Sequence, residues 1–317
     1  MRPWRFVRIF RRRRDVVSRS RPTVSPTQAS PRLLEGAAVG VVGAGQIGGS
    51  IVRCLSRLRP DITLCAFDLH MSLAQRIRPF ALFCRTLGDL VRQSDVVVLA
   101  VPVQTAVRLL PRIAKLAGQR PSRRRLIVCD TSTVKAAVVA AAARHEADFD
   151  FVGLHPLAGT EGRGWDSANA ELYHGRPVVI CPSRARPGRV ARELVGLLGG
   201  IPVAMKPRDH DRFAAEGIGL PHILAFAAAG MVGADTRPAS LLRGGSWRSL
   251  TRVATSSPAM VAGFLHENRD HQLRVLARFT KYLEAVARDL RRPSAGGLER
   301  QLAGWQRPTR TTGSGSQ

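Results

Sequence analysis

The sequence predicts an α/β fold followed by an all-helical segment. Between residues 37 and 206, short runs rich in Val, Ile and Leu alternate with stretches of helical periodicity. Such alternation is typical of a parallel sheet whose strands are joined by helices. From about residue 207 the apolar residues recur only at helical spacing. The predicted organisation is an α/β domain over 37–206 and a helical domain over 207–290, with disordered segments at 1–36 and 291–317.

A glycine-rich segment identifies the kind of α/β domain. Residues 38–42 have the pattern of a buried strand, residues 51–59 that of an amphipathic helix, and a G-x-G-x-x-G motif lies between them. Its first glycine allows a tight turn, the second a close approach of a pyrophosphate, and the third close packing of helix on strand. The sequence therefore predicts a Rossmann-type dinucleotide-binding domain. The expected cofactor contacts in this motif are Gly43, Gly45, Gln46, Ile47 and Gly48.

A carboxylate at the end of the second predicted strand bears on the choice of cofactor. The run 62–67 ends at Asp68, twenty residues after Gly48. An acid at this place accepts hydrogen bonds from the adenosine ribose and repels a 2′-phosphate, so NAD is the expected cofactor. His70 and Arg76 lie close enough in sequence to soften this preference, which leaves NADP open.

Two further strands end in residues that are expected to face the ligand. The strand-like run 95–102 ends in Val101 and Pro102, which should flank the cofactor. The run 126–129 leads through Asp130 into three hydroxyl residues, Thr131, Ser132 and Thr133. A hydroxyl there can cap the next helix or lie beside nicotinamide and substrate, because ligands of open α/β sheets bind beyond the strand ends. Capping needs only one hydroxyl, so we expect both roles together.

Residues 153–164 combine a histidine, a carboxylate and several glycines. They follow the strand-like residues 149–152 and include His155 and Glu161. A histidine at a strand-to-loop junction, with a carboxylate six residues on, suits proton transfer in a site open to substrate. The alternative is a polar surface loop with a solvated histidine. The dinucleotide motif earlier in the chain favours the catalytic interpretation.

The helical segment predicts a homodimer. Helices are expected over residues 209–217, 221–232, 250–255 and 258–290. Along the last of these, apolar residues recur at helical spacing and define one apolar face: Leu265, Leu273, Leu276, Phe279, Leu283 and Val286. A long amphipathic helix of this kind commonly buries its apolar face in a second subunit.

The two ends of the chain differ in composition from the rest. Residues 1–36 contain Arg11-Arg12-Arg13-Arg14 and a Ser/Thr/Pro-rich stretch, without the apolar core of a secretory signal. This arm is interpreted as an organellar transit peptide, a disordered tail or the product of an upstream start site, and it should be dispensable for activity. The tail from Pro293 is also expected to be disordered.

The formal net charge of +26 does not indicate nucleic-acid binding. The arginines are scattered, and no stretch interleaves them with aromatic residues as a nucleic-acid groove would. The five cysteines stand singly, without metal-ligand spacing, and are expected to be reduced core residues of a cytoplasmic protein. No apolar run approaches the roughly 20 residues of a membrane span. We therefore expect no nucleic acid, no membrane and no metal as partners.

Five motifs in order make the chain resemble the prephenate/arogenate dehydrogenase family of tyrosine biosynthesis, over roughly residues 37–290. The glycine loop is followed by Asp-x-x-Thr-Val-Lys at 130–135 and by Gly-x-His-Pro-x-x-Gly-x-Glu-x-x-Gly at 153–164. Leu-Pro-His at 220–222 and Thr-Arg-Val-Ala at 251–254 complete the pattern. The resemblance implies NAD-dependent oxidative decarboxylation of prephenate to 4-hydroxyphenylpyruvate.

The resemblance also implies roles for single residues. His155 would accept the proton of the ring hydroxyl, and Thr133, where the family usually has serine, would orient His155 or that hydroxyl. Arg252 would bind a substrate carboxylate. Glu161 would position groups or gate access, and His222 would line the pocket. Ser132 is placed with the substrate and Thr131 with the cofactor, while Lys135 is not expected to be catalytic.

Two departures from the family pattern leave the substrate open. Ile218-Gly219 stands where the family has Ser-His, and Thr133 replaces serine. Arogenate or 4-amino-4-deoxyprephenate are therefore alternatives to prephenate. A hydroxyacid dehydrogenase or imine reductase shares the glycine loop but does not require the His155 loop. A non-catalytic NAD-binding sensor is disfavoured because His155, Glu161 and Arg252 are all present.

Overall fold

The computed structural model describes residues 33–122, 124–160, 162–181, 184–231 and 241–306. Most of the predicted basic arm lies outside these residues. Its last four residues do not belong to a disordered segment, which corrects the predicted boundary. Leu34 is fully buried, and the carboxylate of Glu193 accepts the backbone N–H groups of Leu33 at 2.8 Å and Leu34 at 3.2 Å. The apolar Leu33-Leu34 pair supplies the buried surface that holds this turn.

The α/β part, residues 33–204, is called the sheet half below. Its eight strands follow the order β3-β2-β1-β4-β5-β6-β7-β8, and all neighbours are parallel except β6 and β7. The first six strands thus have the order expected of a Rossmann fold. The strands are β1 Ala38–Val42, β2 Thr63–Phe67, β3 Leu82–Phe83, β4 Val96–Leu99, β5 Ile127–Asp130, β6 Asp150–Pro156, β7 Pro177–Ile180 and β8 Ile201–Ala204.

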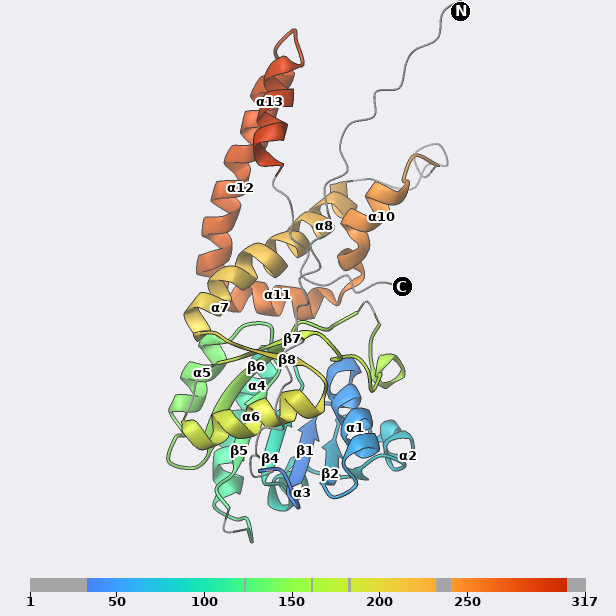
Figure 1. Ribbon diagram of the computed structural model, residues 1–317, viewed down its shortest axis with the longest axis vertical. Coiled ribbons are helices and arrows are strands. Elements are labelled where there is room, and N and C mark those ends of the chain that lie inside the picture. The colour runs from blue at the N-terminus through green and yellow to red at the C-terminus, as the bar shows by residue number, and fades with distance from the viewer. Residues whose placement is uncertain (1–32, 123, 161, 182–183, 232–240, 307–317) are drawn as a thin grey trace, which may run out of the picture. The chain divides into compact units, whose positions relative to one another are not determined.

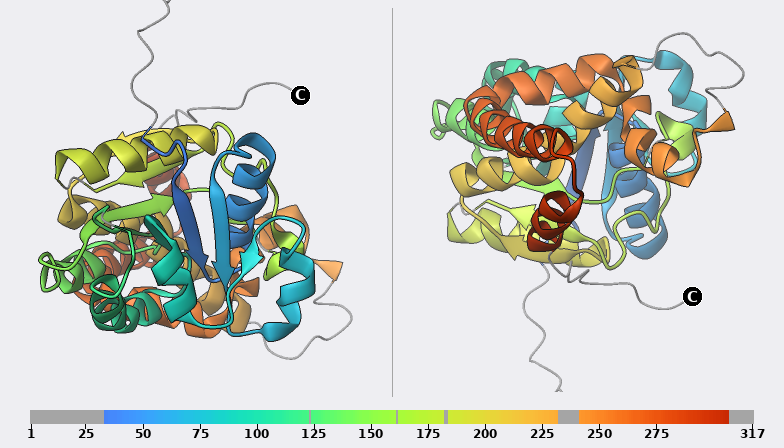
Figure 2. Two further views of the ribbon diagram at one scale, coloured as in Figure 1. Left: turned by 90° about the horizontal axis from the view of Figure 1, so that it is seen from below. Right: turned by 90° about the horizontal axis from the view of Figure 1, so that it is seen from above.

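Helices cover both faces of this sheet (Figure 2). The first helix begins at Gln46, five residues earlier than predicted, because the glycine motif forms its first turn. The short elements between β2 and β4 were not predicted from the sequence. The helical elements are α1 Gln46–Leu58, η1 Met71–Leu73, α2 Ala74–Ile77, α3 Leu87–Gln93, α4 Val103–Ala117, α5 Ala136–Ala143, η2 Trp165–Ser167 and α6 Ala185–Leu197.

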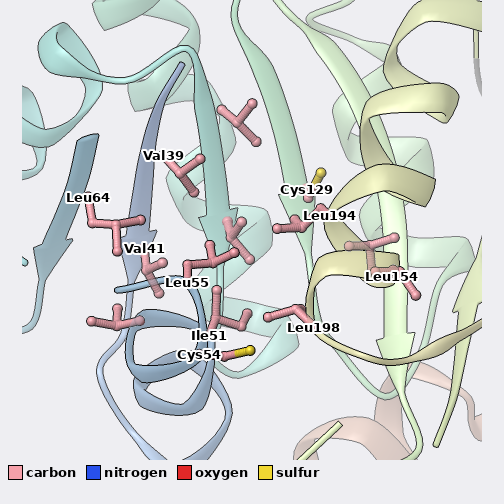
Figure 3. Close-up of a cluster of buried hydrophobic side chains, with 14 of the residues drawn as sticks. Val39, Val41, Ile51, Cys54, Leu55, Leu64, Cys129, Leu154, Leu194 and Leu198 are labelled. Atoms are coloured by element: carbon pink, nitrogen blue, oxygen red, sulfur yellow. The ribbon is translucent and has the colours of Figure 1, made fainter. Parts of the chain in front are cut away.

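The sheet separates two apolar cores. On one face, residues of β1 and β6 pack against α1 and α6, as Val41, Ile51, Leu154 and Leu194 show in Figure 3. On the other face, the strands pack against α3, α4 and α5. Strands β4 and β5 are buried along their whole length, which explains why their sequences are continuous apolar runs rather than alternating ones. The carboxyl ends of these strands are thereby fixed on a rigid platform.

The remaining described residues, 207–231 and 241–306, are helical and are called the helical half. Helix α7 passes directly into α8 through a π turn, Ala215–Gly219. The predicted single helix over 258–290 is wrong, because the chain breaks at Asn268, whose side-chain N–H donates to the carbonyl of Asp211 at 2.7 Å. The elements are α7 Pro207–Ala214, η3 Ala215–Gly219, α8 Leu220–Met231, α10 Gly245–Thr251, η4 Arg252–Thr255, α11 Pro258–Glu267, α12 Arg269–Leu290 and α13 Gly296–Trp305.

Helix α13 contradicts the predicted disorder of residues 291–317 over the part that is described. It lies beside α12 (Figure 1), and the ring of Trp305 meets that of Tyr282 edge-on at 4.9 Å between centroids. Leu298, Leu302 and Trp305 recur at helical spacing, so the segment has an apolar face that the composition of the tail obscured. Residues 307–317 lie outside the described part of the chain.

The elements α7, η3 and α8 form one continuous helix of 25 residues, Pro207–Met231, with mean hydropathy 1.3 over its most apolar window. By length and composition alone this helix could cross a membrane, contrary to the expectation from the sequence, and 22% of its most apolar window is buried. Its first turns carry His210 and Asp211, both buried against the sheet half. The expectation that no membrane is involved stays a prediction.

Candidate active site

A cavity of about 560 Å³ lies where the glycine loop, the carboxyl ends of the strands and the helical half meet. Ligands of open α/β sheets bind at this edge of the sheet. Its walls are contributed by four segments of the sheet half and by η3, α8, η4 and α11 of the helical half. The residues used below that line it are Gln46, Ile47, Thr131, Thr133, His155, Thr160, Arg163, Ile218, His222, Arg252, Met260 and Phe264.

The glycine motif has the features that a dinucleotide requires. Gly43 has φ +91°, and a Cβ there would lie 2.5 Å from the carbonyl oxygen of Ala100. A Cβ on Gly48 would lie 2.0 Å from the carbonyl oxygen of Gly43, whereas a Cβ on Gly45 would meet nothing within 4 Å. Two glycines are thus needed for packing, and the third leaves open space. The first turn of α1 has no acidic residue and no side-chain cap, so its N–H groups can donate hydrogen bonds to a phosphate.

Asp68 lies at the end of β2, beside the glycine motif. Its Oδ2 accepts the backbone N–H of Ala44 at 2.8 Å, and its Oδ1 accepts that of His70 at 2.9 Å. The carboxylate is therefore fixed in place while keeping lone pairs for ribose hydroxyls. Arg76, which could soften the preference for NAD, forms an ion pair with Asp166 in the described structure.

A second cavity of about 190 Å³ adjoins the first, since both are lined by Ile47, Ala100, Thr131, Thr133, Met260 and Phe264. It is lined by four of the predicted cofactor residues, Ile47, Val101, Pro102 and Thr131, together with Ser132. The Oγ of Ser132 is buried and has no hydrogen-bond partner among the described residues. A buried hydroxyl of this kind can serve a polar group of a ligand. Ser132 thus lies on the predicted cofactor side of the cavity rather than beside His155.

His155 is the penultimate residue of β6 and its side chain is buried. Its Nδ1 lies 2.8 Å from Nε2 of His210 on α7, and Nδ1 of His210 lies 2.8 Å from Oδ1 of Asp211. The carboxylate of Asp211 also accepts the backbone N–H groups of Lys135 at 2.7 Å and Ala136 at 2.8 Å. A chain of hydrogen bonds therefore links His155 in the sheet half to Asp211 in the helical half.

The surroundings of His155 keep its imidazole neutral. Burial lowers the pKa of His155 well below its usual 6.5, and the neighbouring His210 and Lys135 lower it further. At neutral pH the ring is consequently an unprotonated base. A histidine that lines a ligand cavity in this state can take a proton from a bound hydroxyl.

Lys135 is fully buried and makes a structural contact. Its Nζ donates to Oδ2 of Asp130 and to the carbonyl of Leu154, each at 2.5 Å. Because Leu154 precedes His155, this lysine joins the end of β5 to the segment that carries the histidine. Both charges are removed from water, so each depends on the other.

Three of the other residues predicted to contact the substrate lie in the same cavity. Thr133, His222 and Arg252 all line it, but no hydrogen bond joins Thr133 to His155 within the described part of the chain. Nδ1 of His222 donates a hydrogen bond to the carbonyl oxygen of Ile218 at 2.8 Å, because a carbonyl can only accept. Glu161 lies outside the described residues.

The structure corrects the expected place of Gly219. As departures from the family pattern, Ile218, Gly219 and Thr133 were all expected at the substrate. Ile218 and Thr133 line the cavity, whereas Gly219 faces away from it. A Cβ on Gly219 would lie 1.9 Å from Nε2 of Gln272, a buried residue of α12. The missing side chain at 219 is therefore compensated by Gln272.

Sequence reasoning missed several residues of this site. His210 and Asp211 occupy the first turns of a helix, where polar residues are ordinary, and they lie 55 residues from His155. The pairing of Gln46 with Thr160, through the amide oxygen at 3.0 Å and the amide N–H, also spans the glycine loop and the His155 loop. Arg163 lines the cavity and donates to the carbonyl of Thr255. Among these residues, only the adjacent pair His210-Asp211 is a sequence pattern that could have indicated a place in the site.

The fold and this cavity define a class of protein. A Rossmann domain with a phosphate-accepting glycine loop, a buried base and a helical second domain at the same cavity is the architecture of a dinucleotide-dependent oxidoreductase. Within the described residues, no group of three or more His, Cys, Asp or Glu side chains is placed to hold a metal ion.

Comparison with known proteins places the chain more narrowly. Residues 59–201 match the family model of the prephenate dehydrogenase nucleotide-binding domain, and residues 206–303 match that of the prephenate dehydrogenase dimerization domain. The chain belongs to the prephenate dehydrogenase family. It is 31% identical over 259 residues to the cyclohexadienyl dehydrogenase of Zymomonas mobilis, which covers 78% of this chain and 86% of that protein. The prephenate dehydrogenase of Bacillus subtilis is 25% identical over 256 residues, with 78% and 67% covered.

Solved structures agree with this assignment. A crystal structure of prephenate dehydrogenase from Aquifex aeolicus, in complex with hydroxyphenyl propionate and NAD+, superimposes with a TM-score of 0.74. The two chains are 26% identical, and the match covers 85% of this chain and 96% of the other. Arogenate dehydrogenase from Synechocystis, at 24% identity and a TM-score of 0.66 over 84% and 96% of the chains, shares the fold.

Proposed function

We propose that this protein catalyses the NAD-dependent oxidative decarboxylation of prephenate to 4-hydroxyphenylpyruvate. The observation that carries the proposal is the single cavity of about 560 Å³ that the glycine loop and the buried, neutral His155 both line. A hydride acceptor and a proton acceptor are the two groups that oxidation of a carbinol requires. Membership of the prephenate dehydrogenase family supports the choice of substrate.

In this proposal His155 accepts the proton of the ring hydroxyl at Nε2, the ring nitrogen not used by His210. When bound, NAD supplies the acceptor for the hydride that leaves the carbinol carbon. As the carbonyl develops, the bond to the ring carboxylate breaks, CO2 departs, and the electron pair makes the ring aromatic. The phenolate oxygen then takes the proton back from His155, which gives the hydroxyl of the product. His155 lies on β6, a buried strand, which holds it in place as the hydroxyl loses its proton.

Arg252 and Arg163 are proposed to bind the two carboxylates of the substrate. Both line the cavity, and the contact of Arg163 with the carbonyl of Thr255 brings the His155 loop to η4, the element that begins with Arg252. A guanidinium can hold a carboxylate through two parallel hydrogen bonds. His222 and Thr133 are proposed to contact the ring or side chain. The role of Glu161 in gating the loop stays a prediction from the family resemblance.

NAD rather than NADP is the proposed cofactor. The carboxylate of Asp68 is fixed by two backbone N–H groups where the adenosine ribose binds in this fold, and a 2′-phosphate would be repelled by it. The ion pair of Arg76 with Asp166 engages a cation that could otherwise offset this repulsion. The relative from Aquifex aeolicus, crystallised with NAD+, supports the same choice.

The protein is further proposed to act as a homodimer in the cytoplasm, with residues 37–206 binding the cofactor and residues 207–290 completing the site and the subunit interface. The match to a dimerization domain supports the dimer. Leu273 and Leu283 of α12 are 64% and 55% exposed within one chain, which gives a second copy apolar surface to cover. The five cysteines are buried and free, as reduced thiols of a cytoplasmic protein would be.

The first test is NADH formation with purified protein, NAD and prephenate, arogenate or 4-amino-4-deoxyprephenate in turn. We expect turnover with prephenate. His155→Asn should lower kcat roughly 100- to 10,000-fold, the usual contribution of a general base, with the affinity for NAD kept. His266→Asn, on the exposed surface of α11, is the matched control. Unchanged turnover in His155→Asn, or silence on all three substrates with NAD still bound, would reject the proposal.

A further inference from the structure

The geometry points to His210 and Asp211 as a positioning pair that fixes the tautomer and the orientation of His155. The three side chains are all buried, with exposed fractions of 6%, 4% and 3% in the order His155, His210, Asp211. Two contacts of 2.8 Å connect them in a row. The catalytic consequence of this inference rests on the proposed function, but the tautomer itself does not.

Asp211 determines which group donates and which accepts in this chain of hydrogen bonds. A carboxylate only accepts hydrogen bonds, so Nδ1 of His210 must carry the proton that it shares with Oδ1. The charge of Asp211 is already stabilised by the backbone N–H groups of Lys135 and Ala136. These lie at the start of α5, whose N-terminal end carries partial positive charge. Asp211 therefore needs no doubly protonated His210 to balance it.

The tautomer of His210 in turn determines the tautomer of His155. A singly protonated His210 with its proton on Nδ1 has only a lone pair at Nε2. Nδ1 of His155, 2.8 Å away, must consequently donate to it. The proton of neutral His155 is thus held on Nδ1, and Nε2 is left with a lone pair. The opposite tautomer would present an N–H at Nε2 and could not accept the proton of a substrate hydroxyl.

The same two hydrogen bonds remain in place after His155 has taken a proton at Nε2. The imidazolium still donates from Nδ1 to His210, and His210 still donates to the anionic Asp211, so no further proton needs to move. Lys135, and His210 whenever it carries a second proton, oppose a positive charge on His155, whereas the nearby carboxylates of Asp130 and Asp211 favour it. Asp130 is neutralised by its contact with Lys135. Asp211, through His210, is the carboxylate that remains to stabilise the charged ring.

The row also joins the two halves of the protein. His155 belongs to β6, whereas His210 and Asp211 belong to α7 of the helical half. Asn268 secures α7 from the other side by donating to the carbonyl of Asp211 at 2.7 Å. His155 therefore adopts the Nδ1–H tautomer only when α7 is packed against the sheet half.

The direct test is the ¹⁵N spectrum of the folded protein labelled at its eight histidines, because nitrogen chemical shifts distinguish the two tautomers without substrate. The His155 signals are assigned by their loss in His155→Asn. We expect the Nδ1–H tautomer in the wild type and appearance of the Nε2–H tautomer in His210→Leu. An Nε2–H tautomer of His155 in the wild-type protein would overturn the inference, whatever the activity of the enzyme.

Kinetics supply the second measurement. His210→Leu should lower kcat about a hundredfold and leave KM within about threefold, since it removes no substrate contact. His210→Gln can place an amide oxygen near the position of Nε2, and it should recover most of kcat. Asn268→Leu is the matched control, because it loosens α7 without touching either ring.

Equal losses of kcat in His210→Leu and Asn268→Leu, with the His155 tautomer unchanged, would reduce the pair to a structural contact and refute the inference. If His210→Leu does not fold, the tautomer of His155 in the wild-type protein and the kcat of His210→Gln still test the inference. Inactivity on all candidate substrates together with an Nδ1–H tautomer would leave the inference standing and reject the proposed function instead.

Discussion

The two halves of this protein bury their apolar residues in different ways. In the sheet half, β4 and β5 are wholly buried and two cores fill both faces of the sheet within a single chain. In the helical half, α12 leaves Leu273, Leu283 and Leu290 at 64%, 55% and 67% exposure. The buried cluster there is small, with Val103, Val134, Val261 and Phe264 as its members, and two of these come from the sheet half.

This difference shows that a chain can place stability and assembly in separate regions. The sheet half gains its hydrophobic free energy within the chain, whereas the helical half has apolar surface left for another copy to cover. The match of residues 206–303 to a dimerization domain agrees with this division. The active site lies where the sheet half meets the helical half. Substitutions in the two halves should therefore have distinguishable effects on stability and on assembly.

The largest effect is expected from breaking the buried ion pair of the sheet half. Lys135→Met leaves Asp130 charged and buried, which should lower the free energy of unfolding by about 3–5 kcal/mol. Lys281→Met, on the exposed face of α12, is the control and should change stability by less than about 0.5 kcal/mol. Urea denaturation of both variants measures the contrast. Equal stabilities would show that the sheet half does not depend on this pair.

The next effect concerns assembly. Leu283→Glu places a charge on the exposed apolar face of α12, and it should weaken dimerisation about a hundredfold because burying an unpaired charge is costly. Light scattering over a range of concentrations measures the change in mass. Leu58→Glu, at a similarly exposed leucine of α1 in the sheet half, should leave the mass unchanged. Dissociation by both variants, or by neither, would contradict the division between the halves.

A smaller effect is expected at the substrate. Arg252→Gln removes one charged contact with a carboxylate, worth roughly 1.5–3 kcal/mol, so KM for prephenate should rise about 10- to 100-fold. Arg248→Gln, on the neighbouring helix α10 and not part of the cavity wall, is the control. Steady-state kinetics with NAD in excess separate the two. A fall in kcat without a rise in KM would assign Arg252 a different role.

The smallest and most specific effect is the dependence on pH. Because the pKa of His155 is well below 6.5 in the folded protein, the acidic limb of kcat/KM should lie below pH 6.5. The unfolded chain binds a proton at about pH 6.5 and the folded one does not. Stability should therefore fall as pH decreases from that value toward the lowered pKa, by up to about 1.4 kcal/mol for each pH unit. His155→Asn should abolish this contribution, and a profile that matches the wild type would refute it.

Local sequence patterns were sufficient for much of the fold. Within about thirty residues the chain contains a strand, the glycine motif, a helix and Asp68. Each of these features depends on local backbone geometry, which residues close in sequence determine. The β-branched runs of β4 and β5 identify buried strands for the same reason. Helix boundaries were less well predicted, since Asn268 breaks a continuous apolar period through a contact with Asp211, which no local pattern contains.

The sequence by itself determined the class of this protein, because the spacing of Gly43, Gly45 and Gly48, the acid at 68 and the His155 loop are short-range features whose chemistry can be read residue by residue. Only the tertiary structure decided which groups prepare His155 and which residues share its cavity. His210 and Asp211 reach it from another half of the chain, Gly219 turns away to face Gln272, and Arg163 lines the cavity. Burial, hydrogen-bond direction and the loss of water act through distances in space, and those distances exist only once the chain is folded.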